Sequence, residues 1–127
     1  MDLKELLKRW SELEPQRCDL IDDGNYWSVI AKDGHRWRLD KRNLIENWPT
    51  EHAKLQFAVQ EAIKARGWGF VSTTIPSYAQ VDIILPSEKT ERGYERLPFL
   101  LSRRQENDFL TTLLFAYIAA LEAQKKQ

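Results

Sequence analysis

The stretch YWSVIAKDGHRWRL, residues 26–39, decides the fold more than any other part of the chain. Two runs rich in aromatic and β-branched residues flank Asp33-Gly34, a pattern typical of a β-hairpin with a two-residue turn. Such a turn pairs Ile30 with Trp37. Because this register leaves neither face of the hairpin cleanly polar, we expect other elements to cover both faces in part.

Apolar periodicity outside the hairpin predicts three helices and a second pair of strands. Apolar residues at i, i+3, i+4 and i+7 mark one face of a helix, and strict alternation marks a strand. The predicted helices are residues 2–14, 50–66 and 103–124, and the predicted strands are residues 68–75 and 78–85. Together these elements predict an α+β fold, an antiparallel sheet of about four strands with helices packed on its faces, in the order α-β-β-α-β-β-α.

Three stretches between these elements carry weaker signals. Residues 18–23 have no clear period, and residues 40–49 are expected to be a connector that ends in Trp48-Pro49. Residues 86–98 are polar and charged, which predicts a long loop that could hold a short strand near Tyr94. The length of 127 residues fits a single domain, residues 1–127.

Composition and charge narrow the class of protein. Lys and Arg together number 19, as do Asp and Glu, so the formal net charge is zero. Since a nucleic-acid-binding domain carries a basic excess, that class is the least favoured. The single cysteine excludes a disulfide within the chain, and neither a leader nor a run of ~20 apolar residues is recognised. We therefore expect a cytoplasmic protein that makes no membrane contact.

The chain carries no convincing catalytic or metal-binding pattern. The candidate ligands Cys18, His35 and His52 lack the spacing of a zinc site, and no Gly-x-Ser-x-Gly motif is present. Cys18 is expected to be a part-buried free thiol, and both histidines are expected at the surface. The five glycines are scattered, so no phosphate-binding loop is predicted. We therefore predict a protein that is not an enzyme and takes neither a cofactor nor a metal.

Basic and aromatic residues together are the strongest binding signal. In the predicted register Trp27, Arg36 and Arg38 share a face of the hairpin. A guanidinium over an indole is a favourable pair, and the same combination could stack a base and hold a phosphate. The simpler interpretation is that the arginine stems cover the ring.

A second basic cluster is expected near the last helix. Arg103 and Arg104 fall in its predicted first turn, where the helix dipole disfavours cations. Two arginines at that end could bind an anion or the carboxylates of a partner, and Arg92 and Arg96 in the preceding loop could join them. Nearby Glu106 and Asp108 could instead offset the charge.

Several short motifs make the chain resemble the phage ABA sandwich domain family. They are Leu13-Glu14-Pro15 after a leucine-rich helix, Trp48-Pro49 before a helix that ends in Ala65-Arg66-Gly67-Trp68, and a last helix with Phe115-Ala116-Tyr117-Ile118-Ala119-Ala120-Leu121. The resemblance implies a phage or mobile-element origin and helices on both faces of an antiparallel sheet. It implies no activity, so it assigns no functional residue.

The predicted function is that of a small, non-enzymatic protein-binding or accessory module. Its partner would be an unidentified protein, and a homo-oligomer is compatible with this interpretation. The alternative is a protein that sequesters an anionic small molecule such as a nucleotide, with nucleic-acid binding less favoured. The candidate binding residues are Trp27, Arg36, Arg38, Arg96, Arg103 and Arg104.

The chain has five tryptophans. Because an indole is costly to leave exposed, each ring is expected either in the core or on a binding surface. Trp10 lies on a helical apolar stripe and Trp37 faces Ile30 in the predicted hairpin, so both are expected in the core. Trp48 and Trp68 bracket the second predicted helix and are expected to fix its ends. Trp27 is left as the expected binding ring.

Overall fold

The computed structural model describes residues 2–75, 78–86, 94–96, 101–103 and 109–125. Its fold is α+β, and every strand pairing within these residues is antiparallel. The contacts divide the chain into two compact units, Met1–Ala62 and Ile63–Gln127, which we call the first and second units. That the chain forms a single domain stays a prediction.

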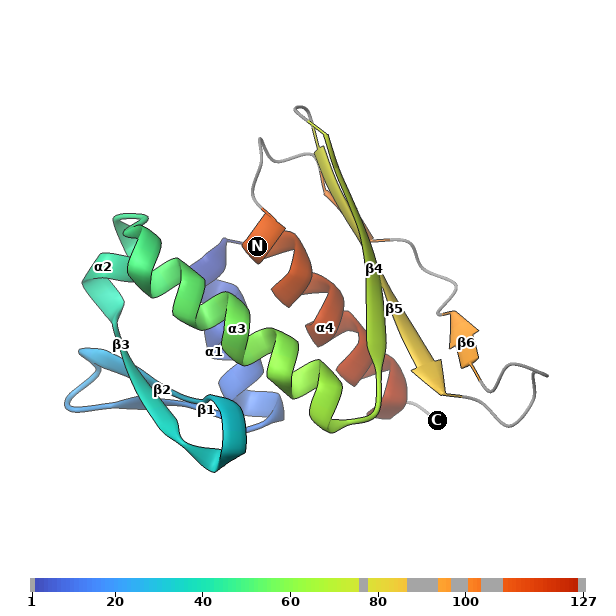
Figure 1. Ribbon diagram of the computed structural model, residues 1–127. Coiled ribbons are helices and arrows are strands. Elements are labelled where there is room, and N and C mark those ends of the chain that lie inside the picture. The colour runs from blue at the N-terminus through green and yellow to red at the C-terminus, as the bar shows by residue number, and fades with distance from the viewer. Residues whose placement is uncertain (1, 76–77, 87–93, 97–100, 104–108, 126–127) are drawn as a thin grey trace. The chain divides into compact units, whose positions relative to one another are not determined.

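The chain forms more helices and strands than the predicted order contains (Figure 1). The first unit holds a three-stranded sheet in the order β1-β2-β3, and the second holds a four-stranded sheet in which β5 pairs with β4, β6 and β7. The predicted single sheet of about four strands is therefore wrong in detail. The described elements are α1 (Leu3–Leu13), β1 (Cys18–Ile21), β2 (Tyr26–Ile30), the 3-10 turn η1 (Lys32–Gly34), β3 (Arg36–Asp40), α2 (Lys41–Ile45), α3 (Pro49–Ala65), β4 (Gly69–Ile75), β5 (Tyr78–Pro86), β6 (Tyr94–Arg96), β7 (Leu101–Arg103) and α4 (Phe109–Lys125).

Helix α1 confirms the first predicted helix. Asp2 caps it, because its Oδ1 accepts a hydrogen bond of 2.9 Å from the N–H of Glu5. The helix buries Leu6, Leu7 and Trp10 and contacts β1. Burial of this apolar stripe attaches the helix to the sheet of the first unit.

The β2–β3 hairpin lies one residue away from the predicted register. Trp37 lies opposite Val29, and Ile30 lies opposite Arg36. The 3-10 turn η1 replaces the two-residue turn, and Gly34 adopts a positive φ of 78° within it. The N–H of Ala31 donates to the carbonyl of His35 at 2.6 Å and closes this longer loop.

Helix α2 and the start of α3 lie in the region predicted to be a connector. Asn47, with a φ of 62°, ends α2 in the left-handed conformation. Its N–H donates to the carbonyl of Leu44, and the N–H of Trp48 donates to the carbonyl of Asn43 at 3.0 Å. This pair of bonds is a Schellman motif. Pro49 then occupies the first position of α3, where its missing N–H costs nothing.

Helix α3 confirms the second predicted helix, and the boundary between the two units falls within it. Its buried residues are Leu55, Ala58, Val59, Ala62 and Ile63, the predicted apolar stripe. Gly67, with a φ of 74°, follows its end as predicted. The N–H of Gly67 donates to the carbonyl of Lys64, and that of Trp68 donates to the carbonyl of Ile63, which makes a second Schellman motif.

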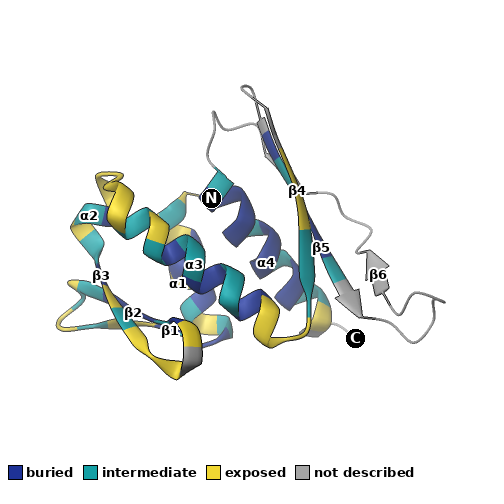
Figure 2. Ribbon diagram, in the orientation of Figure 1, coloured by how far each residue is buried: buried dark blue, intermediate teal, exposed yellow. Residues whose placement is uncertain are grey.

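The sheet of the second unit packs one face on α4. In β5 the alternating residues Ala79, Val81 and Ile83 are buried as predicted, and α4 contacts β5 (Figure 2). Phe70 of β4 lies opposite Ile83, and its ring contacts Phe109 of α4 at 6.3 Å between centroids. The short strand β6 confirms the strand suggested near Tyr94, whereas β7 was not predicted.

Candidate functional site

Trp27 does not share a face with Arg36 and Arg38, and that prediction is wrong. Trp27 lies opposite Leu39, so its face is the one that carries Val29 and Trp37. Only 4% of Trp27 is exposed. A shift of one residue in register moves each residue of β3 to the other face relative to β2. The predicted register was off by one residue, and it therefore placed Trp27 with Arg36 and Arg38 and mixed polar with apolar residues on both faces.

The two arginines of β3 are engaged within the first unit. Arg36 donates from Nη1 to Ser28 Oγ at 3.1 Å and from Nη2 to the carbonyl of Gln16 at 2.7 Å. Arg38 lies over the ring of Tyr26, 4.5 Å from its centroid, and forms an ion pair with Asp22. An arginine does cover an aromatic ring, but the ring belongs to Tyr26.

The second basic cluster differs from its prediction as well. Arg103 ends β7 and α4 begins at Phe109, so Arg103 is not in the first turn of the last helix. Arg96 lies opposite Ile84 and Arg103 opposite Ala79, toward the two ends of β5. Arg92 and Arg104 lie outside the described residues.

The turn between α2 and α3 exposes two large apolar side chains. Ile45 is 57% exposed and Trp48 is 52% exposed. They lie three positions apart in the sequence, along a turn that the Schellman motif fixes. We call residues 40–49 the α2–α3 corner.

An open depression of about 480 Å³ lies beside the corner in the first unit. The loop between β1 and β2 forms one side and the corner forms the other, and the carbonyl of Asn25 accepts a hydrogen bond of 3.1 Å from the N–H of Lys41 between them. This bond holds the two sides together. The lining residues are Gly24, Asn25, Tyr26, Asp40, Lys41, Arg42, Ile45 and Glu46.

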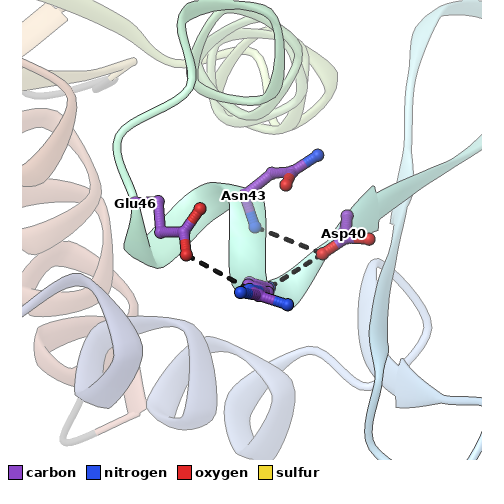
Figure 3. A network of polar contacts seen from close by, with 4 residues as sticks. Asp40, Asn43 and Glu46 are labelled. Atoms are coloured by element: carbon purple, nitrogen blue, oxygen red, sulfur yellow. Dashed lines mark hydrogen bonds and ion pairs between the residues drawn. The ribbon is translucent and has the colours of Figure 1, made fainter.

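Most of the negative charge in the depression is already engaged (Figure 3). Oδ1 of Asp40 accepts from the N–H groups of Arg42 and Asn43 and caps α2. Oε1 of Glu46 accepts from Nε of Arg42 at 3.1 Å. The guanidinium of Arg42 contacts Glu46 through Nε, and the Arg42 side chain is 85% exposed. Lys41, which is half-buried, also lines the depression.

Trp48 differs from the other four tryptophans in its surroundings. Trp10 Nε1 donates to Glu14 Oε1 at 3.0 Å, and Trp37 stacks on Phe57 with centroids 5.4 Å apart. The ring of Trp68 meets Tyr117 at 6.0 Å. These contacts and the burial of Trp27 leave Trp48 as the exposed ring, without a ring contact among the described residues.

Trp48 and Trp68 occupy the same local position but differ in exposure, which the sequence alone does not reveal. Both follow a helix end at the same position of a Schellman motif. Trp68 also lies under the guanidinium of Arg66, 5.1 Å from the ring centroid, whereas Trp48 is half exposed. One signal was available: Trp48 supplies the first carbonyl of α3, a capping position where small polar residues are usual.

Among the described residues, no group of three or more His, Cys, Asp or Glu side chains could hold a metal ion. Cys18 is fully buried, its Sγ lies 3.9 Å from the carbonyl of Leu7, and burial raises the pKa of its thiol far above the ordinary value. A thiol in this state is a poor nucleophile.

No helix within the described residues has the length and apolar character needed to cross a membrane. No family model, curated protein or solved structure matches the chain. The resemblance to the phage ABA sandwich domain family therefore stays a prediction.

Proposed function

We propose that this protein is a small, non-enzymatic binding module that docks on another protein through the α2–α3 corner. The observation that carries the proposal is the exposure of Trp48 and Ile45 beside the depression. Aromatic anchors with a neighbouring pocket dominate the free energy of protein interfaces. Trp48 could supply such an anchor, because it is 52% exposed and makes no ring contact among the described residues.

The charges of the depression favour one kind of partner surface. Asp40 caps α2 and Glu46 pairs with Nε of Arg42, and the Arg42 side chain is 85% exposed, so its Nη groups are the donors that a ligand could meet. We therefore propose that the partner presents an apolar side chain next to a carboxylate. The apolar group would occupy the depression beside Ile45, and the carboxylate would pair with Arg42.

The test is affinity capture with three versions of the full chain. Wild type, Trp48→Ala/Ile45→Ser and the control Lys64→Ala are immobilised at equal density, and retained host proteins are quantified. The control truncates an exposed side chain of α3 in the second unit. The proposal predicts proteins retained by wild type and the control and lost with the double variant. Retention that is equal on all three, or absent on all three, contradicts it.

Charge dependence provides a second arm of the same experiment. Arg42→Glu reverses the exposed charge at the depression, and it should reduce retention of the same proteins at least about tenfold if a carboxylate faces it. The charge-conserving Arg42→Lys variant should retain most binding. Equal retention by both variants would refute the acidic character of the partner.

No contact among the described residues supports the predictions of small-molecule binding, a phage relation or a cytoplasmic location. In the small-molecule alternative, Trp27 or Trp37 stacks a base and Arg36, Arg38, Arg103 or Arg104 holds a phosphate. Both rings lie on the face of the sheet opposite to Arg36 and Arg38. We retain a phage or mobile-element relation and a cytoplasmic location as proposals. The genes that neighbour this one would test the former, and fractionation of cells would test the latter.

A further inference from the structure

Among the described strands, β4 has no partner on its outer edge. It pairs with β5 along its whole length and stands at the end of the order β4-β5-β6, because β7 also pairs with β5 (Figure 1). In an antiparallel pair, every second residue turns its N–H and C=O away from its neighbour. Within residues 69–73, the N–H and C=O groups that point away from β5 make no hydrogen bond to any backbone group of the described residues.

The other edge strands of the described residues are protected, and β4 is not. Proteins shield an edge by keeping it short or by placing charges or proline on it. Strand β1 has four residues with Asp19 among them, β3 carries Arg36, Arg38 and Asp40, and β6 and β7 have three residues each, with Arg96 and Arg103. Strand β4 has seven residues, GFVSTTI, with no charged residue and no proline.

We propose that β4 pairs antiparallel with β4 of a second copy of this chain and forms a two-fold symmetric dimer. The composition of the strand favours its own copy, because an uncharged strand brings no like charges together when it meets itself. The formal net charge of zero removes overall repulsion between copies as well. A two-fold contact uses both open edges, so association stops at two chains. This proposal does not depend on the α2–α3 corner.

The symmetry fixes the register. Pairing all seven residues of β4 places Ser72 on the two-fold axis, so that Val71 lies opposite the partner's Thr73. Val71 is 43% exposed and Thr73 is exposed, and both lie on the sheet face opposite to Phe70, which contacts α4. Two β-branched residues would therefore meet twice across the axis, a favourable cross-strand pair.

The test measures the mass of the full chain in solution over a range of concentrations by sedimentation. One strand pairing buries less surface than a standard interface, so the dimer should dissociate on dilution. We expect the wild-type mass to rise from 15.0 kDa toward twice that value. Val71→Lys/Thr73→Lys places ammonium groups opposite each other twice, and it should weaken dimerisation by about tenfold or more.

A charge-swapped variant tests the register itself. Val71→Lys/Thr73→Glu has the same sites, but in the proposed register each ammonium faces a carboxylate, so the dimer should return. Ile45→Lys/Trp48→Lys adds two positive charges in the first unit and should leave dimerisation unchanged. Circular dichroism confirms that each variant is folded.

Three results would overturn the proposal. A wild-type chain that stays at 15.0 kDa at all concentrations excludes the dimer. A dimer that survives Val71→Lys/Thr73→Lys does not use β4. Failure of Val71→Lys/Thr73→Glu to associate more tightly than the double-lysine variant excludes the register.

Discussion

The indole Nε1 of Trp10 donates a hydrogen bond of 3.0 Å to Oε1 of Glu14, and both side chains are buried. The bond spans one helical turn at the end of α1, where the N–H of Glu14 also donates to the carbonyl of Trp10 at 2.7 Å. A buried carboxylate oxygen is stable only when it has donors, so the pair fixes how α1 ends.

Trp10→Phe removes this donor and part of a fully buried ring. We expect the free energy of unfolding to fall by about 2–4 kcal/mol, from the lost hydrogen bond and the volume left behind. Urea denaturation measures it, with Leu20→Ala, at a 39% exposed position, as the control. A loss no larger than that of the control would contradict the role of the pair.

Cys18 makes stability depend on pH in the alkaline range. Burial, and to a smaller extent Asp19 and Glu14, raises the pKa of the Cys18 thiol from its ordinary value of 9.0. The folded thiol stays protonated above pH 9 while the unfolded thiol ionises, so stability should fall as pH rises, by about 1.4 kcal/mol per pH unit from this group. Urea denaturation between pH 8 and pH 10.5 should show a steeper loss for wild type than for Cys18→Ala. The same pH dependence of unfolding free energy in wild type and Cys18→Ala would refute the role of the buried thiol.

Asp40 should determine the shape of the α2–α3 corner. Asp40→Ala removes an acceptor from the N–H groups of Arg42 and Asn43, and we expect a loss of about 0.5–2 kcal/mol in unfolding free energy. Asp40→Asn keeps an N-cap oxygen and should lose much less. Thermal denaturation of the two variants measures the difference, and equal losses would show that the cap is unimportant.

Trp48 should dominate the quenching of tryptophan fluorescence by small solutes. It is 52% exposed, whereas Trp10 and Trp27 are almost fully buried. Trp48→Phe should lower the quenching constant of the native protein for iodide, and Trp68→Phe should lower it less. A larger effect at Trp68 would mean that the exposed ring has been misassigned.

Long periodic elements could be predicted from the sequence, and short ones could not. Helix α3 and strand β5 have enough residues for an apolar period to emerge, and both were confirmed. Strand β1 has four residues, which is only two periods of a strand, and α2 has five, little more than one helical turn. Their existence depends on pairing with β2 and on the cap at Asp40.

The sequence could not predict the candidate site, for two separate reasons. The register of the hairpin depends on whether Asp33-Gly34 forms a two-residue turn or part of a longer 3-10 loop, and one residue of difference separates Trp27 from Arg36. The exposure of Trp48 depends on its tertiary neighbours. Trp68 has the same local geometry but meets Tyr117, so local sequence cannot distinguish the two rings.

Site-specific photo-crosslinking shows whether Trp48 contacts a partner protein. A benzophenone amino acid is introduced at Trp48 in the full chain, and at the exposed Lys64 as the control, and both proteins are irradiated in host lysate. We expect a discrete adduct between position 48 and another protein, absent at position 64 and reduced by Arg42→Glu. No adduct from position 48, or the same adducts from both positions, would contradict it.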